Sequence, residues 1–206
     1  LFNAILERIY EIDNIQDNKQ ISLELEKIID KMIIFGNEKG GIRKKYVELT
    51  DKKKRLAGLD SIKSDTQEIA KDLQNEIIDY IIFTDDVNKL KVKEIIEKYR
   101  TKFEEGLATK DYKYIAIPTR LNKDPTSYKT KTFALKAIEN AKLNMAMNER
   151  FYIVILKSGP FGFKNLADLK YLKLDIDKEY MWDRIKRKAD IFLDLFPSEQ
   201  KTLGEF

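Results

Sequence analysis

The sequence predicts an α+β fold in which a region of short strands is followed by a mainly helical region. Between residues 21 and 56, short stretches alternate apolar and polar residues, which is typical of half-buried strands. From residue 64 onward the apolar residues recur every three to four positions, which predicts amphipathic helices. Strands first and helices afterwards is the order expected of an α+β protein.

The strand region begins after an apolar stripe. Leu1, Ile5 and Ile9 share one face of a predicted helix over residues 1–12, which starts in mid-turn, so we expect the chain to begin late. Residues 21–26 alternate as a strand within ISLELEKIIDKMIIF. After the loop GNEKGG, IRKKYVEL predicts a second strand that pairs with this stretch, and residues 50–61 hold a further short strand.

The first long helix is predicted from its cap and its period. Asp65 precedes Glu68 by three positions, a capping-box arrangement, and apolar residues then fall every four positions from Ile69 to Ile81. A second helix follows from about Asp86, with Gly106 as its C-terminal stop.

The second half of the chain, from residue 114 onward, is predicted to contain short strands, turns and two further helices. Residues 114–118 read as extended, Pro125 as a turn, and residues 132 to about 144 as a third, basic helix. The apolar run FYIVIL predicts a buried strand, and SGPFGF a turn. Residues 177–196 predict a last long helix, stopped by Pro197.

Composition limits the possible functions. With 206 residues and 43% hydrophobic residues, the chain can form one or two domains. No apolar run approaches the roughly 18–20 residues that span a bilayer, and no secretion signal is recognisable, so we expect a cytoplasmic protein without a membrane partner. The absence of cysteine and histidine excludes thiol nucleophiles, ordinary zinc sites and imidazole bases.

Positive charge is concentrated in one stretch. Residues 110–142 hold eight Lys or Arg against three Asp or Glu, while the chain as a whole carries +4. Lysines that neutralise phosphates, together with hydroxyl and amide groups that bond them, suit contact with a nucleic-acid backbone. The alternative is the solvated surface of a lysine-rich protein.

Five motifs, taken in order, resemble the C-terminal third of family B DNA polymerases of the archaeal and eukaryotic replicative type: LELEK, IRKKYVEL, AGLDSIKSDTQEIAKDLQ, YKYIAIPTRLNKDPTSYKTKTFALKA and IDKEYMWDRIKRKADIFLDLF. The resemblance implies a partial palm sheet with a helix (residues 1–60), a mainly helical thumb domain (61–197) and a C-terminal peptide (198–206). Ala57, Thr66 and Phe133-Ala134 depart from the family's pattern.

The palm part implies contact with the primer strand. Lys44, Lys45 and Tyr46 resemble the family's K-x-Y motif, whose lysine and tyrosine lie along the primer near its 3′ end. Glu24 and Glu26 resemble the strand beside the catalytic carboxylates and are candidates for peripheral metal support. The alternative for both motifs is structural: the lysines and glutamates would be exposed charges, and the tyrosine a half-buried residue, on amphipathic strands.

The thumb part implies contact with the duplex backbone. Lys63 opens a segment similar to the family's R-x-D motif, and residues 128–132 are similar to its Y-K...T segment. The expected DNA-binding residues of the thumb are therefore Lys63, Arg120, Lys123, Tyr128, Lys129 and Thr132.

The family's two catalytic aspartates have no counterpart in this sequence. In the family they hold two magnesium ions for nucleotidyl transfer. The resemblance therefore implies a DNA-directed DNA polymerase, a nucleotidyltransferase, that is inactive as this chain alone. Mg²⁺ would be bound in the assembled enzyme, by a larger subunit of a split polymerase or an upstream portion that also carries the fingers and exonuclease.

The tail SEQKTLGEF places Gln200, Leu203 and Phe206 three positions apart. One helical turn would put Leu203 and Phe206 on one face to fill a hydrophobic pocket. This spacing resembles the sliding-clamp-binding (PCNA-interacting) peptide that archaeal family B polymerases often carry at their C-terminus, although only one terminal aromatic is present.

Two other hypotheses remain open on the sequence. The chain is a non-catalytic accessory protein that binds DNA and clamp without a polymerase partner, or a helical scaffold whose lysines only confer solubility. A larger subunit that bears aspartates would distinguish the polymerase from the accessory protein. Duplex affinity that falls steeply with salt would exclude the scaffold.

Overall fold

The structure is a computed structural model that describes residues 28–35 and 44–196, with Asp168 described by its backbone alone. It confirms the α+β class with two three-stranded antiparallel sheets, joined by helices. The α-helices and strands are β1 (Lys31–Ile34), β2 (Tyr46–Thr50), β3 (Lys53–Ala57), α2 (Glu68–Phe83), α3 (Lys89–Ala108), α4 (Tyr112–Ile115), β4 (Ile117–Arg120), α5 (Phe133–Ala141), β5 (Arg150–Leu156), β6 (Gly159–Phe163) and α6 (Lys178–Leu193). Short 3₁₀ helices span Asp60–Ile62, Pro125–Ser127 and Leu166–Tyr171.

The first sheet has the order β1-β2-β3 and packs against α2. The expected pairing across the glycine-rich loop is present, with Val47 opposite Ile33 and Leu56. Lys31 ties the sheet to the helix, because its Nζ donates to the carbonyls of Ile81 (2.9 Å) and Thr84 (2.7 Å) at the end of α2. The helix predicted over residues 1–12 and the strand over 21–26 lie outside the described residues.

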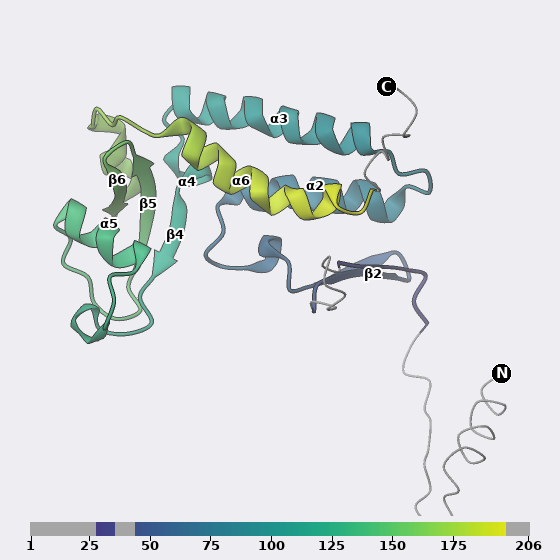
Figure 1. Cartoon of the computed structure of the whole chain (residues 1–206), viewed down its shortest axis with the longest axis horizontal. Helices are drawn as coiled ribbons and strands as arrows, with labels where there is room; N and C mark the ends of the chain where they lie inside the picture. The colour runs from purple at the N-terminus through teal and green to yellow at the C-terminus, as the bar shows by residue number, and fades with distance from the viewer. Residues whose placement is uncertain (1–27, 36–43, 197–206) are drawn as a thin grey trace, which may run out of the picture.

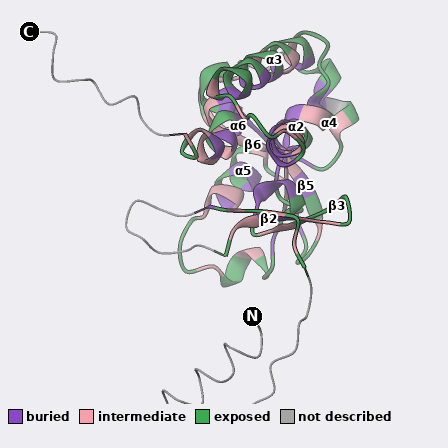
Figure 2. Ribbon diagram, turned by 90° about the vertical axis from the view of Figure 1, so that its right-hand side faces the viewer, coloured by how far each residue is buried: buried purple, intermediate pink, exposed green. Residues whose placement is uncertain are grey.

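Helix α2 lies between the first sheet and the pair formed by α3 and α6 (Figure 1). Its buried positions lie on more than one side, since Ile77 and Ile78 are adjacent in the chain and both are buried. Figure 2 shows the buried residues gathered along this helix. Burial of several isoleucines, each contributing about 1.5–3 kcal/mol, makes α2 the centre of the core.

The buried core continues from the first sheet to the last helix. Phe35, which directly follows β1, meets Phe192 of α6 edge-on with ring centroids 5.3 Å apart. Both belong to the same cluster of buried residues. The predicted boundary between residues 60 and 61 therefore crosses a shared core, and the division into two domains stays a prediction.

The capping box predicted at Asp65 is wrong. Helix α2 begins at Glu68, its N-cap is Gln67, and that residue makes no side-chain capping bond. Thr66 and Gln67 are each only 3% exposed, whereas Asp65 lies outside the helix and is exposed. These two residues are buried in the core before the helix starts, and the chain turns at residues 64–66 rather than beginning the helix there.

The stop predicted at Gly106 is also wrong. Helix α3 continues to Ala108, and Lys110 then takes a positive φ of 57°. Gly106 is buried, and a Cβ there would lie 3.2 Å from Cγ2 of Ile115. The glycine therefore allows α3 to approach α4 closely, and chain reversal occurs after it.

The second sheet, ordered β4-β5-β6, was only partly predicted. Strand β5 confirms the apolar run; of SGPFGF only Ser158 lies in a turn, and Gly159–Phe163 form strand β6. A Cβ on Gly162 would lie 3.0 Å from Cδ1 of Leu143 and 3.1 Å from the carbonyl of Ala137, so this glycine makes room for α5 on the sheet. Pro160 is tolerated because β6 is an edge strand.

The segment before β4 also differs from the prediction. Residues 114–118 are not all extended, because α4 ends at Ile115 and β4 begins at Ile117. Helices α5 and α6 confirm the remaining predictions, and each has a side-chain cap. Thr132 accepts a bond from the Leu135 amide at 3.3 Å, and Asp177 accepts one from the Tyr180 amide at 3.0 Å.

Candidate nucleic-acid interface

A groove of about 550 Å³ lies between the segment before α2, strand β4, and the start of α5. Its polar side chains include Lys63, Arg120 and Thr132, three of the residues expected to contact DNA. They come from stretches of the sequence separated by up to 69 positions, and the fold brings them together. We call this site, with Asn122 and Arg184, the basic groove.

Lys63 is already engaged within the protein. Its Nζ lies 2.8 Å from Oδ1 of Asp60, and Nζ of Lys188 lies 3.2 Å from the same oxygen. Burial by itself raises the pKa of Asp60, but the bond from Lys63 and the interactions with Lys188 outweigh it and hold that pKa below its usual value. Lys63 is therefore less available to a phosphate than an unpaired cation.

Arg120 has no ion-pair partner in the described part of the chain and lies beside another cation. It is exposed at the end of β4, directly opposite Arg150 of β5. Like charges in a directly opposed pair destabilise a sheet. Neither arginine has an ion-pair partner among the described residues. This edge of the sheet therefore concentrates positive charge that an external anion can neutralise.

Arg184 was missed by the sequence analysis. It comes from α6, lines the basic groove, and its guanidinium carbon lies 5.0 Å from the ring centroid of Phe133. The sequence shows a basic stretch from Arg184 to Lys188, but helical register alone does not reveal which of these cations reaches the groove.

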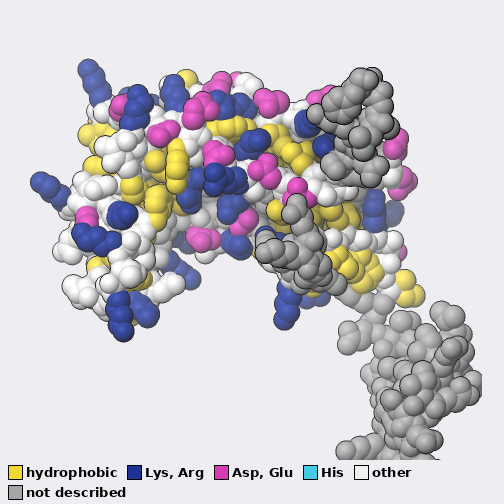
Figure 3. Space-filling view, viewed as in Figure 1, with side chains coloured by type: hydrophobic (Ala, Val, Ile, Leu, Met, Phe, Trp, Pro, Cys, Tyr) yellow, Lys and Arg dark blue, Asp and Glu magenta, His cyan; other side chains and the backbone are white. Residues whose placement is uncertain are grey.

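The loop from residue 121 to 131 carries the other expected contacts of the thumb. Lys123 and Lys129 are exposed, and Tyr128 is half-buried against the core. Asp124 fixes the turn between Lys123 and Lys129 by accepting two hydrogen bonds from Thr126. The hydroxyl of Thr126 donates one, its backbone amide donates the other at 2.9 Å, and both bonds lower the pKa of Asp124. Figure 3 shows Lys and Arg side chains at this lower left part of the molecule, with few acids beside them.

The expected palm contacts lie at the start of β2. Lys44 is exposed, while Lys45 and Tyr46 are half-buried. Their backbone passes close to Gly58, which has a φ of +66° and whose Cβ would stand 2.2 Å from the Lys44 carbonyl. These residues do not line the basic groove. The first sheet and the 121–131 loop nevertheless lie on the same, lower side of the molecule in both ribbon views (Figures 1 and 2).

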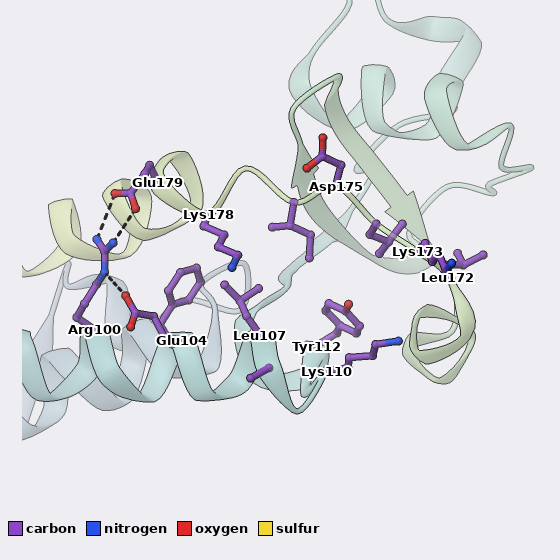
Figure 4. A pocket seen from close by; sticks show the side chains of 14 residues that line it. Arg100, Glu104, Leu107, Lys110, Tyr112, Leu172, Lys173, Asp175, Lys178 and Glu179 are labelled. Carbon is purple, nitrogen blue, oxygen red and sulfur yellow. Dashed lines mark hydrogen bonds and ion pairs between the residues drawn. The ribbon is translucent and has the colours of Figure 1, made fainter.

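A concavity larger than the basic groove lies elsewhere in the described part of the chain. It has a volume of about 710 Å³ and lies between the end of α3 and residues 172–179 (Figure 4). Arg100 pairs there with Glu104 at 2.9 Å and with Glu179 at 2.7 Å, and these bonds raise its pKa. Because opposite charges compensate one another, this pocket offers less attraction to a polyanion than the basic groove.

Several expectations fall on residues beyond this description. Glu24, Glu26, Gln200, Leu203 and Phe206 all lie outside the described residues. Within residues 28–35 and 44–196, no three acidic side chains gather in a way that could hold a metal ion. No helix in those ranges is long and apolar enough to cross a bilayer.

The backbone arrangement resembles that of a known enzyme. A family B DNA polymerase from the hyperthermophilic archaeon Pyrobaculum calidifontis superposes on 97% of this chain with a TM-score of 0.61 and 16% sequence identity. The fold is polymerase-like. The chain spans about a quarter (25%) of the length of that polymerase. No family model and no curated protein matches the sequence.

The polymerase-like fold agrees with the resemblance found in the motifs. At this level of identity the likeness concerns the arrangement of the elements, and the roles of individual side chains do not follow from it. The basic groove and the exposed lysines therefore remain candidate contacts, whose function is argued from their own geometry and charge.

Proposed function

We propose that this chain is the part of a family B DNA polymerase that grips primer-template duplex. The observation that carries the proposal is the basic groove on a polymerase-like fold, which Arg120 and Arg184 both line without an ion-pair partner among the described residues. A polyanion is the ligand that two such cations attract most strongly.

The chemistry of the groove suits backbone contact rather than base reading. Its cations would neutralise phosphates, while Asn122 and the hydroxyl of Thr132 would donate hydrogen bonds to phosphate oxygens. Lys123 and Lys129 would extend the contact along the strand, and Lys44 and Tyr46 would meet the primer on the same side of the molecule. We therefore expect binding that depends strongly on salt and weakly on sequence.

Catalysis would reside outside the described residues. A larger subunit, or an upstream portion of the same protein, would supply the aspartates, and Mg²⁺ would bind there. The role that we propose for the described residues is to hold the substrate in place for that reaction. The residues Gln200, Leu203 and Phe206 would tether the assembly to a sliding clamp.

Primer extension tests the proposal directly. The chain would be assayed with Mg²⁺ and deoxynucleotides, first alone and then in complex with the larger protein that copurifies with it. We expect no extension by the chain alone and extension by the complex. Binding of duplex without extension in either form would favour the accessory DNA-binding protein, and lack of duplex binding at moderate salt would reject both.

A further inference from the structure

We infer that Arg184 is a phosphate-binding residue of the basic groove and that Phe133 positions it. This inference rests on the proposed function, because the phosphate in question belongs to the backbone of duplex DNA. It assigns to α6 a direct part in binding that the basic stretch from residue 110 to 142 does not suggest.

Arg184 differs from the neighbouring Lys and Arg side chains of α6 in its ion pairing. Every other Lys or Arg between residues 184 and 188 is engaged with an acid: Lys186 with Asp190 at 4.0 Å, Arg187 with Asp183 at 2.6 Å, and Lys188 with Asp60 at 3.2 Å. Arg184 has no ion pair with any described residue. Its charge is therefore the one in this stretch of α6 that remains available to a ligand.

Phe133 holds this charge in place. The guanidinium carbon of Arg184 lies 5.0 Å from the centroid of the Phe133 ring, within the range of a cation–π contact. Stacking against a ring restricts the rotation of a long side chain before any ligand arrives. Less conformational entropy is then lost when the planar guanidinium binds a phosphate through two parallel hydrogen bonds.

Burial explains why a ligand would be bound strongly here. Nε of Arg184 is buried and lacks a hydrogen-bond partner in the described part of the chain. Ile117, Ile153 and Phe133 supply apolar walls to the same groove. Charges interact more strongly beside such walls than in bulk water. A phosphate that reaches the groove would therefore gain from both the fork of Arg184 and the nearby Arg120.

One acid opposes this arrangement. Asp65 also lines the groove, and it is exposed. Lys63, Arg120 and Arg184 line the same groove, so the cations outnumber it even when Lys63 remains paired with Asp60. The balance is therefore positive, and Arg120 and Arg184 are the two cations that carry it.

The test is the affinity of the full chain for a labelled duplex of about 24 base pairs, measured by fluorescence anisotropy over a range of KCl concentrations. Arg184→Gln should raise the Kd about tenfold and reduce the salt slope by about one, since one phosphate contact is lost. The matched control is Arg187→Gln, because Arg187 lies on the same helix, is exposed, and does not line the groove. It should change the Kd less than twofold.

Two further variants distinguish a direct role in phosphate binding from a role in the stability of the fold. Arg184→Lys keeps the charge, so the salt slope should stay while affinity falls, since a lysine lacks the fork. Phe133→Leu keeps an apolar side chain but removes the ring. It should weaken duplex binding and leave the dependence of the Kd on KCl concentration unchanged. Melting temperatures measured beside each Kd identify any variant that fails to fold, and Arg184→Lys then decides the question.

The outcomes distinguish this inference from the proposed function. If the unmodified chain does not bind duplex, the proposed function itself fails. If it binds and Arg184→Gln behaves like Arg187→Gln, the role of Arg184 is refuted while the proposed function stands. If Arg184→Lys reduced the salt slope of duplex binding as much as Arg184→Gln does, the positive charge at position 184 would not be what contacts the phosphate, and the inference would be refuted.

Discussion

Gln74 of α2 donates its side-chain amide to the carbonyl of Lys188 in α6, 114 positions further along the chain. Its Oε1 accepts a hydrogen bond of 2.6 Å from the amide of Ser61. Gln74 is fully buried. One glutamine therefore joins the segment that leads to the basic groove, the central helix, and the helix that carries Arg184.

Gln74→Met should destabilise the fold, because methionine has a similar shape but leaves the Ser61 amide without its partner. A buried polar group without a hydrogen bond costs about 1–3 kcal/mol, so the free energy of unfolding should fall by that amount. Urea denaturation measures it. Asn75→Met, at the neighbouring and partly exposed position, is the control, and an equal loss there would contradict the role of Gln74.

Asp60→Asn should remove a stabilisation that depends on pH. The pKa of Asp60 is lower in the folded chain than its ordinary value of 3.8, so its ion pairs stabilise the fold above that value. This contribution disappears as the pH falls through the lower, folded pKa. The difference in unfolding free energy between the wild type and Asp60→Asn should be largest above about pH 5 and should shrink as the pH falls below 3.8.

The control for this measurement is Asp86→Asn, since Asp86 is exposed and has no ion pair with a described residue. Its difference from the wild type should stay small at every pH. A difference for Asp60→Asn that grew as the pH fell would show that the carboxylate is not stabilised by Lys63 and Lys188.

Lys44→Ala should weaken primer extension by the proposed polymerase assembly more than it weakens folding. Lys44 is exposed, so its removal should leave the melting temperature within about 2 °C of the wild type, as for other surface substitutions. Lys53→Ala is the matched control, an exposed lysine of the same sheet. If extension fell only in proportion to melting temperature, the K-x-Y assignment would be lost.

Phe206→Ala should abolish the stimulation of DNA synthesis by a sliding clamp and leave clamp-free synthesis unchanged. Removal of an apolar anchor from a short peptide takes away most of its binding energy. Steady-state primer extension with and without clamp measures the effect. Lys201→Ala, which lies between the motif positions, should retain stimulation, and a Phe206→Ala variant that is still stimulated would exclude the tail from clamp binding.

Local patterns predicted the elements whose ends are set by nearby residues. Helix α6 follows from its helical period, although it ends at Leu193, three residues before the predicted end at residue 196, and β5 follows from a run of apolar residues. Where burial against distant residues decides a boundary, the sequence failed. Helix α2 starts later than predicted, because Thr66 and Gln67 are buried in the core before it. Helix α3 runs past Gly106, because this glycine packs closely against Ile115 instead of ending the helix.

The candidate site divides in the same way. The sequence by itself determined that positive charge gathers between residues 110 and 142, and it made Arg120, Lys123, Lys129 and Lys63 candidates for phosphate contact. Only the tertiary structure decided that Lys63 is held by Asp60 while Arg184 stands over Phe133 in the same groove. Charge is a property of each residue, but its availability to a ligand depends on partners that only folding brings near.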